Sequence, residues 1–180
     1  MVIFVIDKQS KIWVVCYNIL IIIIQFWIAN LLFLMKQGKV RPIALGVFQK
    51  DKRILVSEGF DIIKNQSFFR PLGGKIEFGE YGYQTVIREI KEEIQADVTN
   101  LNYLGTLENI FIYNGQKGHE IVLVYDGEFV DPTMYTRPII NGLEDDGVQI
   151  KAVWKSLLEI KEGGVPLYPS GLMQLLTGST

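Results

Sequence analysis

The fold is decided by residues 74–96, which read GKIEFGEYGYQTVIREIKEEIQA. From residue 81 to residue 95, apolar side chains recur with the period of an amphipathic helix, whose apolar stripe should face the core. That stripe consists of Tyr83, Val86, Ile87, Ile90 and Ile94. On the other side of the expected helix, the spacing i, i+3, i+4 brings three carboxylates within one turn: Glu89, Glu92 and Glu93.

Three neighbouring carboxylates repel one another, and two explanations are open. The group could be a solvated acidic face that Arg88 and Lys91 partly neutralise, and the helix alone favours this explanation. Alternatively, a hard divalent cation could bind them, because such ions prefer oxygen ligands. Gly73-Gly74 and Glu80 precede the helix, and glycines let the backbone approach a ligand closely. The combination at fixed spacing favours the metal site.

Residues 74–96 resemble the Nudix box, Gly-x5-Glu-x7-Arg-Glu-U-x-Glu-Glu-x-Gly-U, in which U is an aliphatic residue. The matching positions are Gly74, Glu80, Arg88, Glu89, Ile90, Glu92 and Glu93. The last two positions depart from the motif, with Gln95 in place of Gly and Ala96 in place of a larger aliphatic residue. A left-handed helix end disfavours Gln by roughly 1 kcal/mol relative to Gly. We therefore expect a slightly strained or shifted helix end and an intact metal site.

The resemblance implies a Nudix hydrolase domain over residues 39–180, with an α+β fold built as an α/β/α sandwich around a mixed sheet. Such enzymes hydrolyse a diphosphate linked to another moiety, usually a nucleoside, using Mg²⁺ or Mn²⁺. It further implies that Glu92, Glu93 and the Gly73 carbonyl bind the metal. Glu89 would be a further ligand or the base that deprotonates water, and Arg88 would hold Glu89. The catalytic set is then Arg88, Glu89 and Glu93.

The resemblance leaves several further roles open. In some branches of the family the general base comes from a later loop, where Glu144 is the candidate. Arg70 and Lys75 bracket the glycines and are candidates for binding substrate phosphate. The alternative function is a catalytically silent Nudix-fold module that binds nucleotides. The expected partner is a small nucleotide rather than a nucleic acid, and the oligomeric state is open, a homodimer included.

Outside the motif, residues 39–180 contain several strand-like segments and few helical ones, as expected for an α+β or α/β/α architecture. Two hairpins are predicted, one from strands 40–48 and 53–60 and one from strands 101–113 and 120–130. A short strand at 67–70 should lead into a loop at 71–74, and a further strand at 148–154 and a short terminal helix at 171–176 complete the prediction.

Composition narrows the possibilities further. A chain of 180 residues with 48% hydrophobic and 21% charged residues fits one folded domain with a short appendage. A single cysteine, Cys16, excludes an internal disulfide and a cysteine-based zinc site. The net charge of −2 gives no overall reason to expect nucleic-acid binding.

Residues 1–38 form an apolar N-terminal segment, and residues 12–35 carry no formal charge. About 20 apolar residues cross a bilayer, so residues 12–35 could form one continuous transmembrane helix. Basic residues after this span would then place the catalytic domain in the cytoplasm, anchored to the membrane. The other interpretation is a spurious upstream extension, with the protein beginning at Met35.

Overall fold

The computed structural model describes residues 21–28, 38–143 and 147–178. The chain divides into two compact units, Met1–Gly38 and Lys39–Thr180. In the first unit, residues 21–28 are helical and largely exposed, and the rest of the helix predicted over 12–35 lies outside the described residues. Among the described residues, no helix combines the length and the apolarity needed to cross a membrane.

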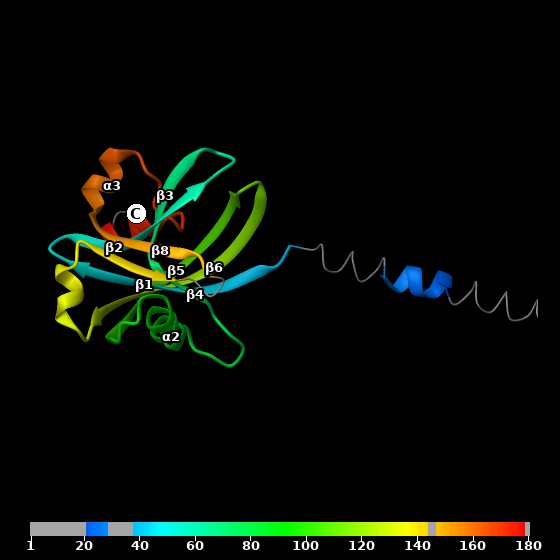
Figure 1. Cartoon of the computed structure of the whole chain (residues 1–180), viewed down its shortest axis with the longest axis horizontal. Coiled ribbons are helices and arrows are strands. Elements are labelled where there is room, and N and C mark those ends of the chain that lie inside the picture. The colour runs from blue at the N-terminus through cyan, green and yellow to red at the C-terminus, as the bar shows by residue number, and fades with distance from the viewer. Residues whose placement is uncertain (1–20, 29–37, 144–146, 179–180) are drawn as a thin grey trace, which may run out of the picture. The chain divides into compact units, whose positions relative to one another are not determined.

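The second unit is a mixed sheet with helices on both faces (Figure 1). Helix α2 (Gly82–Ile94) covers one face, and α3 (Leu157–Gly163) and α4 (Leu172–Thr177) cover the other. Each face has its own hydrophobic cluster, one containing Ile90 of α2 and one containing Leu172 of α4. The predicted α+β fold with an α/β/α arrangement is confirmed.

The sheet has two halves. One half contains β5 (Val98–Tyr113), β6 (Gln116–Phe129), β1 (Val40–Lys50) and β4 (Leu72–Lys75), and the other contains β3 (Gln66–Arg70), β2 (Arg53–Asp61), β8 (Gln149–Ser156) and β7 (Ile139–Leu143). Strands β1 and β2 pair beside their turn. Farther along, β1 pairs with β4 and β2 pairs with β3, so the two halves separate.

Strand β1 lies at the centre of its half, where it pairs in parallel with β6. Its side chains alternate between the two faces of the sheet. Ala44 and Phe48 belong to the cluster under α2, whereas Leu45 and Val47 belong to the cluster on the opposite face. Burial on both faces explains why this strand is almost continuously apolar in sequence.

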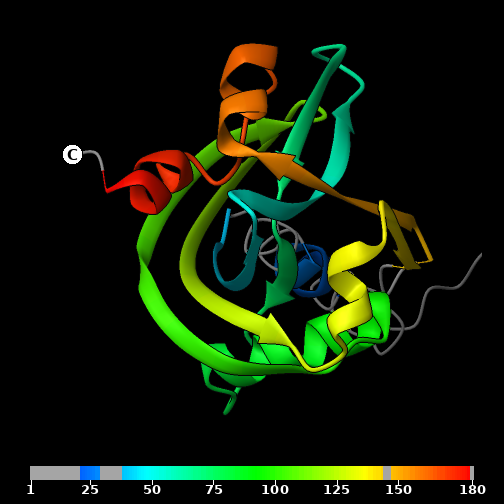
Figure 2. The same cartoon turned by 90° about the vertical axis from the view of Figure 1, so that its left-hand side faces the viewer.

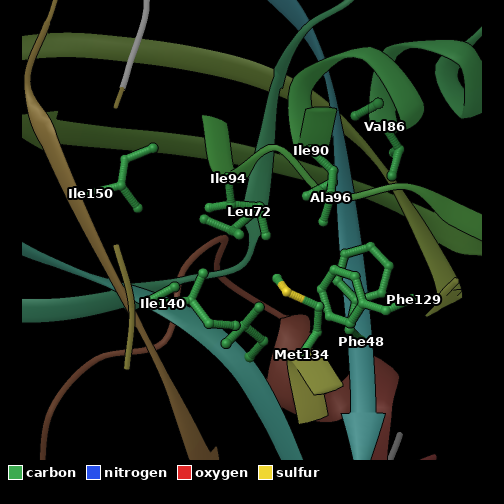
Figure 3. Close-up of a cluster of buried hydrophobic side chains, with 13 residues drawn as sticks. Phe48, Leu72, Val86, Ile90, Ile94, Ala96, Phe129, Met134, Ile140 and Ile150 are labelled. Atoms are coloured by element: carbon green, nitrogen blue, oxygen red, sulfur yellow. The ribbon is translucent and has the colours of Figure 1, made fainter. Parts of the chain in front are cut away.

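Helix α2 packs on the sheet through Val86, Ile90 and Ile94, as predicted (Figure 3). The prediction was wrong for Tyr83 and Ile87, each of which is 43% exposed. The buried side of α2 instead includes Glu89 and Glu93, together with Gly82 and Thr85. Helix α2 contacts β4 and β7 as well as β1. Its buried side therefore includes two of the three carboxylates and not the whole of the predicted apolar stripe.

Both predicted hairpins are present. Strands β5 and β6 pair up to Tyr113 and Gln116 around a two-residue turn at Asn114-Gly115. Irregularities in their register accompany the strong curvature that Figure 2 shows, as expected for bulged strands.

Residues 71–74, predicted as a loop, enter strand β4 because the backbone of Leu72–Lys75 pairs with β1 despite its two glycines. Three elements were not predicted: the 3-10 helix η1 (Pro132–Thr136), strand β7 and helix α3. Helix α3 did carry a local signal, since Ser156 and Glu159 form a capping box at its start.

Candidate active site

Arg88 lies at the centre of the site, where its guanidinium donates to five acceptor oxygens on four residues. Its Nε and Nη2 donate to the two carboxylate oxygens of Glu80, each at 3.0 Å. Nη1 donates to Oε1 of Glu89 at 2.8 Å and to Oε2 of Glu92 at 3.0 Å. Nη2 also donates to the Lys75 carbonyl at 3.0 Å. The Arg88 guanidinium therefore connects the end of β4 with the carboxylates of Glu80, Glu89 and Glu92.

These hydrogen bonds keep Glu80 ionised. The hydrogen bonds from Arg88 lower the pKa of Glu80 from 4.5 to about 2, and a hydrogen bond from Thr85 Oγ1 contributes. Reciprocally, the same pair raises the pKa of Arg88 above its ordinary value. The side chains of Glu80 and Arg88 are only 16% and 29% exposed, respectively, so the pair is partly withdrawn from water. We call this ion pair the clamp.

The two glycines before the helix are needed for different reasons. Gly73 has a φ of 128°, in the region that side chains disfavour, and a Cβ there would lie 2.3 Å from the Ala44 carbonyl oxygen. At Gly74, a Cβ would lie 2.3 Å from Oε1 of Glu89. The missing side chain at position 74 thus makes room for a buried carboxylate, and β4 and α2 approach each other closely at this point.

Glu93 lies farther along α2 and is only 6% exposed. Its carbonyl oxygen packs against Gly142 of β7, where a Cβ would lie 2.1 Å away. Glu92 and Glu93 open onto a pocket of about 1030 Å³ at the end of α2, which we call the helix-end pocket. Its wall includes Asp131, Arg137, Asn141 and Gln149. This polar surface suits a charged ligand.

The end of α2 has the geometry expected from the departure at Gln95. Gln95 adopts the left-handed conformation, with φ 56° and ψ 31°. Its N–H donates to the Lys91 carbonyl at 3.1 Å, and the Ala96 N–H donates to the Ile90 carbonyl at 3.4 Å. The bond from Gln95 to Lys91 is the one that defines an αL helix end, in which Gly is the favoured left-handed residue.

The donor set predicted for a metal consists of the Gly73 carbonyl and the carboxylates of Glu89, Glu92 and Glu93, all oxygen donors suited to Mg²⁺ or Mn²⁺. In the part of the chain that the structure describes, no three acidic, histidine or cysteine side chains lie together in a ready metal cluster. Arg88 bridges Glu89 and Glu92 instead. An ion would therefore have to draw these carboxylates together.

A second pocket of about 540 Å³ lies where the two halves of the sheet separate, and we call it the inter-sheet pocket. Arg70 of β3 lines it, as do the aromatic rings of Phe68, Phe111, Tyr113 and Tyr168. The two pockets share Gln149 and Ile150 at the start of β8, which makes them neighbours.

The remaining predicted residues lie apart from this arrangement. Lys75 is 59% exposed at its side chain and donates to Glu77 at 3.0 Å, and it lines neither pocket. Glu144 lies outside the described residues, so its assignment as an alternative base stays a prediction. Arg41, Asn109 and Glu120, which line the inter-sheet pocket, were not predicted as site residues. Their only sequence signal is a charged residue, Glu120, at the start of the apolar run 121–125.

A sequence model of the NUDIX domain matches residues 39–170, and the chain belongs to that family of hydrolases. The NAD-capped RNA hydrolase NudC of Pseudomonas aeruginosa is 30% identical over 83 residues, which are 43% of this chain and 28% of that protein. The similarity thus spans little more than a quarter of that relative.

Two solved structures show the same fold. A NUDIX hydrolase from Nitrosomonas europaea superposes with a TM-score of 0.57 at 20% identity, covering 77% of this chain and 87% of its own. A MutT NUDIX hydrolase from Burkholderia pseudomallei gives a TM-score of 0.50 at 22% identity, covering 67% and 85%.

Proposed function

We propose that this chain is a hydrolase dependent on Mg²⁺ or Mn²⁺ that cleaves the diphosphate linkage of a nucleoside diphosphate derivative. The observation that carries the proposal is the burial of Glu89 and Glu93 on one side of α2, beside Gly74. Buried carboxylates in proteins are paired with cations, as Glu89 is with Arg88, or coordinate metals. If the carboxylates only formed a solvated acidic face, Glu89 and Glu93 would be exposed to solvent.

In this proposal Glu92, Glu93 and the Gly73 carbonyl hold the metal, with Glu89 as a further ligand or as the base. A bound divalent ion would neutralise charge on the diphosphate and lower the pKa of a bound water. Glu89 would take the proton of the attacking water on its carboxylate. The hydrogen bond from Arg88 Nη1 fixes the orientation of that carboxylate. Arg88 itself stays protonated, because Glu80 stabilises its charge.

The inter-sheet pocket is the proposed binding site for the nucleoside part of the substrate. Aromatic side chains in its wall offer faces on which a base can stack. Arg70 lines the same pocket two residues before Leu72 of β4, so its guanidinium is the better candidate for a phosphate contact. Lys75 is the weaker candidate, because it is paired with Glu77.

We also propose that residues 39–180 act as one catalytic unit, in line with the extent of the second compact unit. For residues 1–38, both interpretations remain: a membrane anchor, or an extension upstream of a start at Met35. Intact mass and membrane fractionation of the protein made from its own gene decide between them. A start at Met35 in the soluble fraction would reject the anchor.

The test of the proposed function is a substrate panel with the full chain, Mg²⁺ or Mn²⁺, and EDTA as the control. The panel contains nucleoside triphosphates, ADP-ribose, dinucleoside polyphosphates, sugar nucleotides and NAD, the last because of the NudC relative. We expect metal-dependent release of a nucleoside phosphate from at least one compound. Binding of nucleotides without any hydrolysis would support the silent binding module instead.

A further inference from the structure

The inter-sheet pocket contains a row of three polar residues that the hydrolytic chemistry does not use. Arg41 of β1 is aligned with Glu120 of β6, and Glu120 is aligned with Asn109 of β5. The next row along the same strands, two residues away, is apolar and belongs to or packs on the core: Ile43, Val122 and Leu107. The polar row therefore stands where the core ends and the pocket begins.

The hydrogen bonds of this row converge on Glu120. Arg41 Nη2 donates to Oε1 of Glu120 at 2.7 Å, and Asn109 Nδ2 donates to Oε2 at 3.3 Å. The Ser170 N–H donates to Oδ1 of Asn109 at 3.2 Å, which fixes the orientation of that amide. The side chain of Glu120 is 4% exposed, while that of Arg41 is 50% exposed.

An ionised carboxylate accepts hydrogen bonds and donates none, and it has room for about four. Arg41 and Asn109 supply one each to Glu120. Since Glu120 also lines the pocket, a ligand there meets a buried acceptor that favours donor groups. A carboxylate pairs well with two donors side by side, which a ligand could offer on one edge.

Guanine presents such a pair, with N1–H and the exocyclic amino group adjacent on one edge. Adenine and cytosine present one amino group next to an acceptor, and uracil presents one N–H between two acceptors. The aromatic rings of Phe68, Phe111 and Tyr113 in the pocket wall favour a flat base over a sugar. Arg70, in the same wall, is available for the phosphate of the same nucleotide.

We propose that the inter-sheet pocket recognises the base of the substrate and that Glu120 selects guanine through its two adjacent donors. Arg41 and Asn109 act as positioning residues that hold the Glu120 carboxylate. The inference rests on the proposed function in so far as the substrate is a nucleotide. It adds the identity of the base, which the Nudix box does not specify.

The first experiment measures binding of GMP, IMP, AMP and UMP to the full chain by titration calorimetry. These monophosphates contain no diphosphate linkage, so binding is measured without cleavage. IMP differs from GMP only in lacking the exocyclic amino group. We expect GMP to bind more tightly than IMP, AMP and UMP, by roughly 10- to 100-fold, the range for a good paired contact to a base.

The second experiment repeats the titrations with Glu120→Gln, which replaces one acceptor oxygen by a donor. The preference for GMP over AMP should fall to within about threefold, since the paired contact is lost. Glu108→Gln is the matched control, because Glu108 lies on the same hairpin, pairs with His119 and is 64% exposed at its side chain. This control should keep the preference, and thermal melts of both variants establish that they are folded.

The outcomes separate this inference from the proposed hydrolase. A guanine preference without hydrolysis of any diphosphate would reject the hydrolase and keep the inference. Hydrolysis with equal binding of GMP, IMP, AMP and UMP, or no GMP binding, would overturn the inference. Equal binding of GMP and AMP that is lost with 2′-deoxy-GMP would also overturn it, since ribose hydroxyls would then be the donors. If Glu120→Gln does not fold, the wild-type comparison of GMP with IMP decides alone.

Discussion

The Nudix box and the inter-sheet pocket differ in how their residues come together. The groups around Arg88, three carboxylates and one backbone carbonyl, come from one continuous stretch, residues 75–92. They meet because a strand, a loop and a helix follow one another along the chain. The inter-sheet pocket draws its wall from β1, β2, β3, β5, β6 and β8. In the proposals above, the box performs the reaction and the inter-sheet pocket selects the substrate.

The largest expected effect tests the box. Glu93→Gln keeps the shape of the side chain and removes one negative charge from the proposed metal site. Loss of a single electrostatic group of this kind lowers kcat by about 10²–10³-fold. The measurement is Mg²⁺-dependent turnover of every accepted substrate, together with a thermal melt without metal. We expect a uniform loss over all substrates and a melting temperature that is unchanged or slightly higher.

Two variants refine that result. Glu108→Gln, an exposed carboxylate outside the site, should leave kcat unchanged. Glu144→Gln should be nearly silent if Glu89 is the base, and should match the Glu93→Gln loss if the later loop supplies it. A folded Glu93→Gln protein with wild-type turnover would mean that the box is not catalytic here, and the binding module would replace the hydrolase.

The next effect tests the pocket. Arg70→Gln removes the proposed phosphate contact, and a hydrogen bond to a charged group contributes about 1.5–3 kcal/mol. We expect KM to rise by roughly 10- to 100-fold with kcat changed by less than about threefold, because the box is intact. Steady-state kinetics on the best substrate supply both constants. A fall in kcat with constant KM would break the comparison, since a pocket residue would then act in the chemical step.

Lys75→Gln is the matched control for Arg70→Gln. Its ammonium group is exposed and paired with Glu77, so the loss of charge should alter KM by less than about threefold. An equal rise of KM in both variants would indicate a general electrostatic effect of positive charge rather than a specific contact of Arg70.

The third effect concerns the clamp that joins Glu80 to Arg88. The folded-state pKa of Glu80 is depressed, from 4.5 to about 2. Its contribution to stability is therefore complete above pH 4.5 and is lost as the pH falls towards 2. Because the pair is only partly withdrawn from water, solvent screening still weakens it, and we expect a contribution on the order of 1 kcal/mol. Glu80→Gln should melt below wild type at pH 7, and the difference should vanish near pH 2.

The clamp also has a kinetic consequence. With Glu80 replaced, Arg88 loses its bidentate partner and holds the Glu89 carboxylate less firmly. We expect kcat to fall by about tenfold, the size of one lost hydrogen bond to a charged group. A parallel loss of stability with full kcat would show that the clamp supports the fold and does not orient Glu89.

The contrast between residues that are close in sequence and residues from distant strands also determines what the sequence could predict. The helix over 81–95 and the contact of Arg88 with Glu89 depend on neighbours along the chain, and periodicity and motif resemblance predicted both. The pairing of Arg88 with Glu80, eight positions away, was not predicted. The burial of Glu89 and Glu93 was not predicted, because it depends on β4 and β7 packing beside α2. A helical wheel places polar side chains towards solvent. It cannot show that Gly74 of β4, which has no side chain, leaves room for the Glu89 carboxylate on the buried side of the helix.

The inter-sheet pocket depends even more on tertiary packing, which the sequence pattern does not reveal. Asn109 and Glu120 meet across a hairpin, and Arg41, 79 positions before Glu120 in the chain, donates to the Glu120 carboxylate. No local pattern encodes that alignment, since it follows from the register of β1 with β6. Arg70 was found only because it stands close to the glycines of the motif.

The smallest effect tests the helix end, where the chain departs from the family motif. Gln95 has a left-handed backbone conformation, which L side chains disfavour by roughly 1 kcal/mol or more. Gln95→Gly relieves that strain, although the added freedom of glycine in the unfolded chain offsets part of the gain. We expect a net stabilisation of about 0.5–1 kcal/mol, or a rise of about 1–4 °C in Tm.

Gln95→Ala is the control, because it removes the side chain from the helix-end pocket but keeps the Cβ that causes the strain. It should leave Tm unchanged or slightly lower, and kcat should stay within about twofold of wild type in both variants, since Gln95 is no part of the proposed metal site. If Gln95→Gly melts lower than wild type, contacts of the Gln95 side chain must outweigh the backbone strain. If it raises Tm but lowers kcat, the strained helix end helps to hold Glu92 and Glu93, and the departure from the motif is part of the active site.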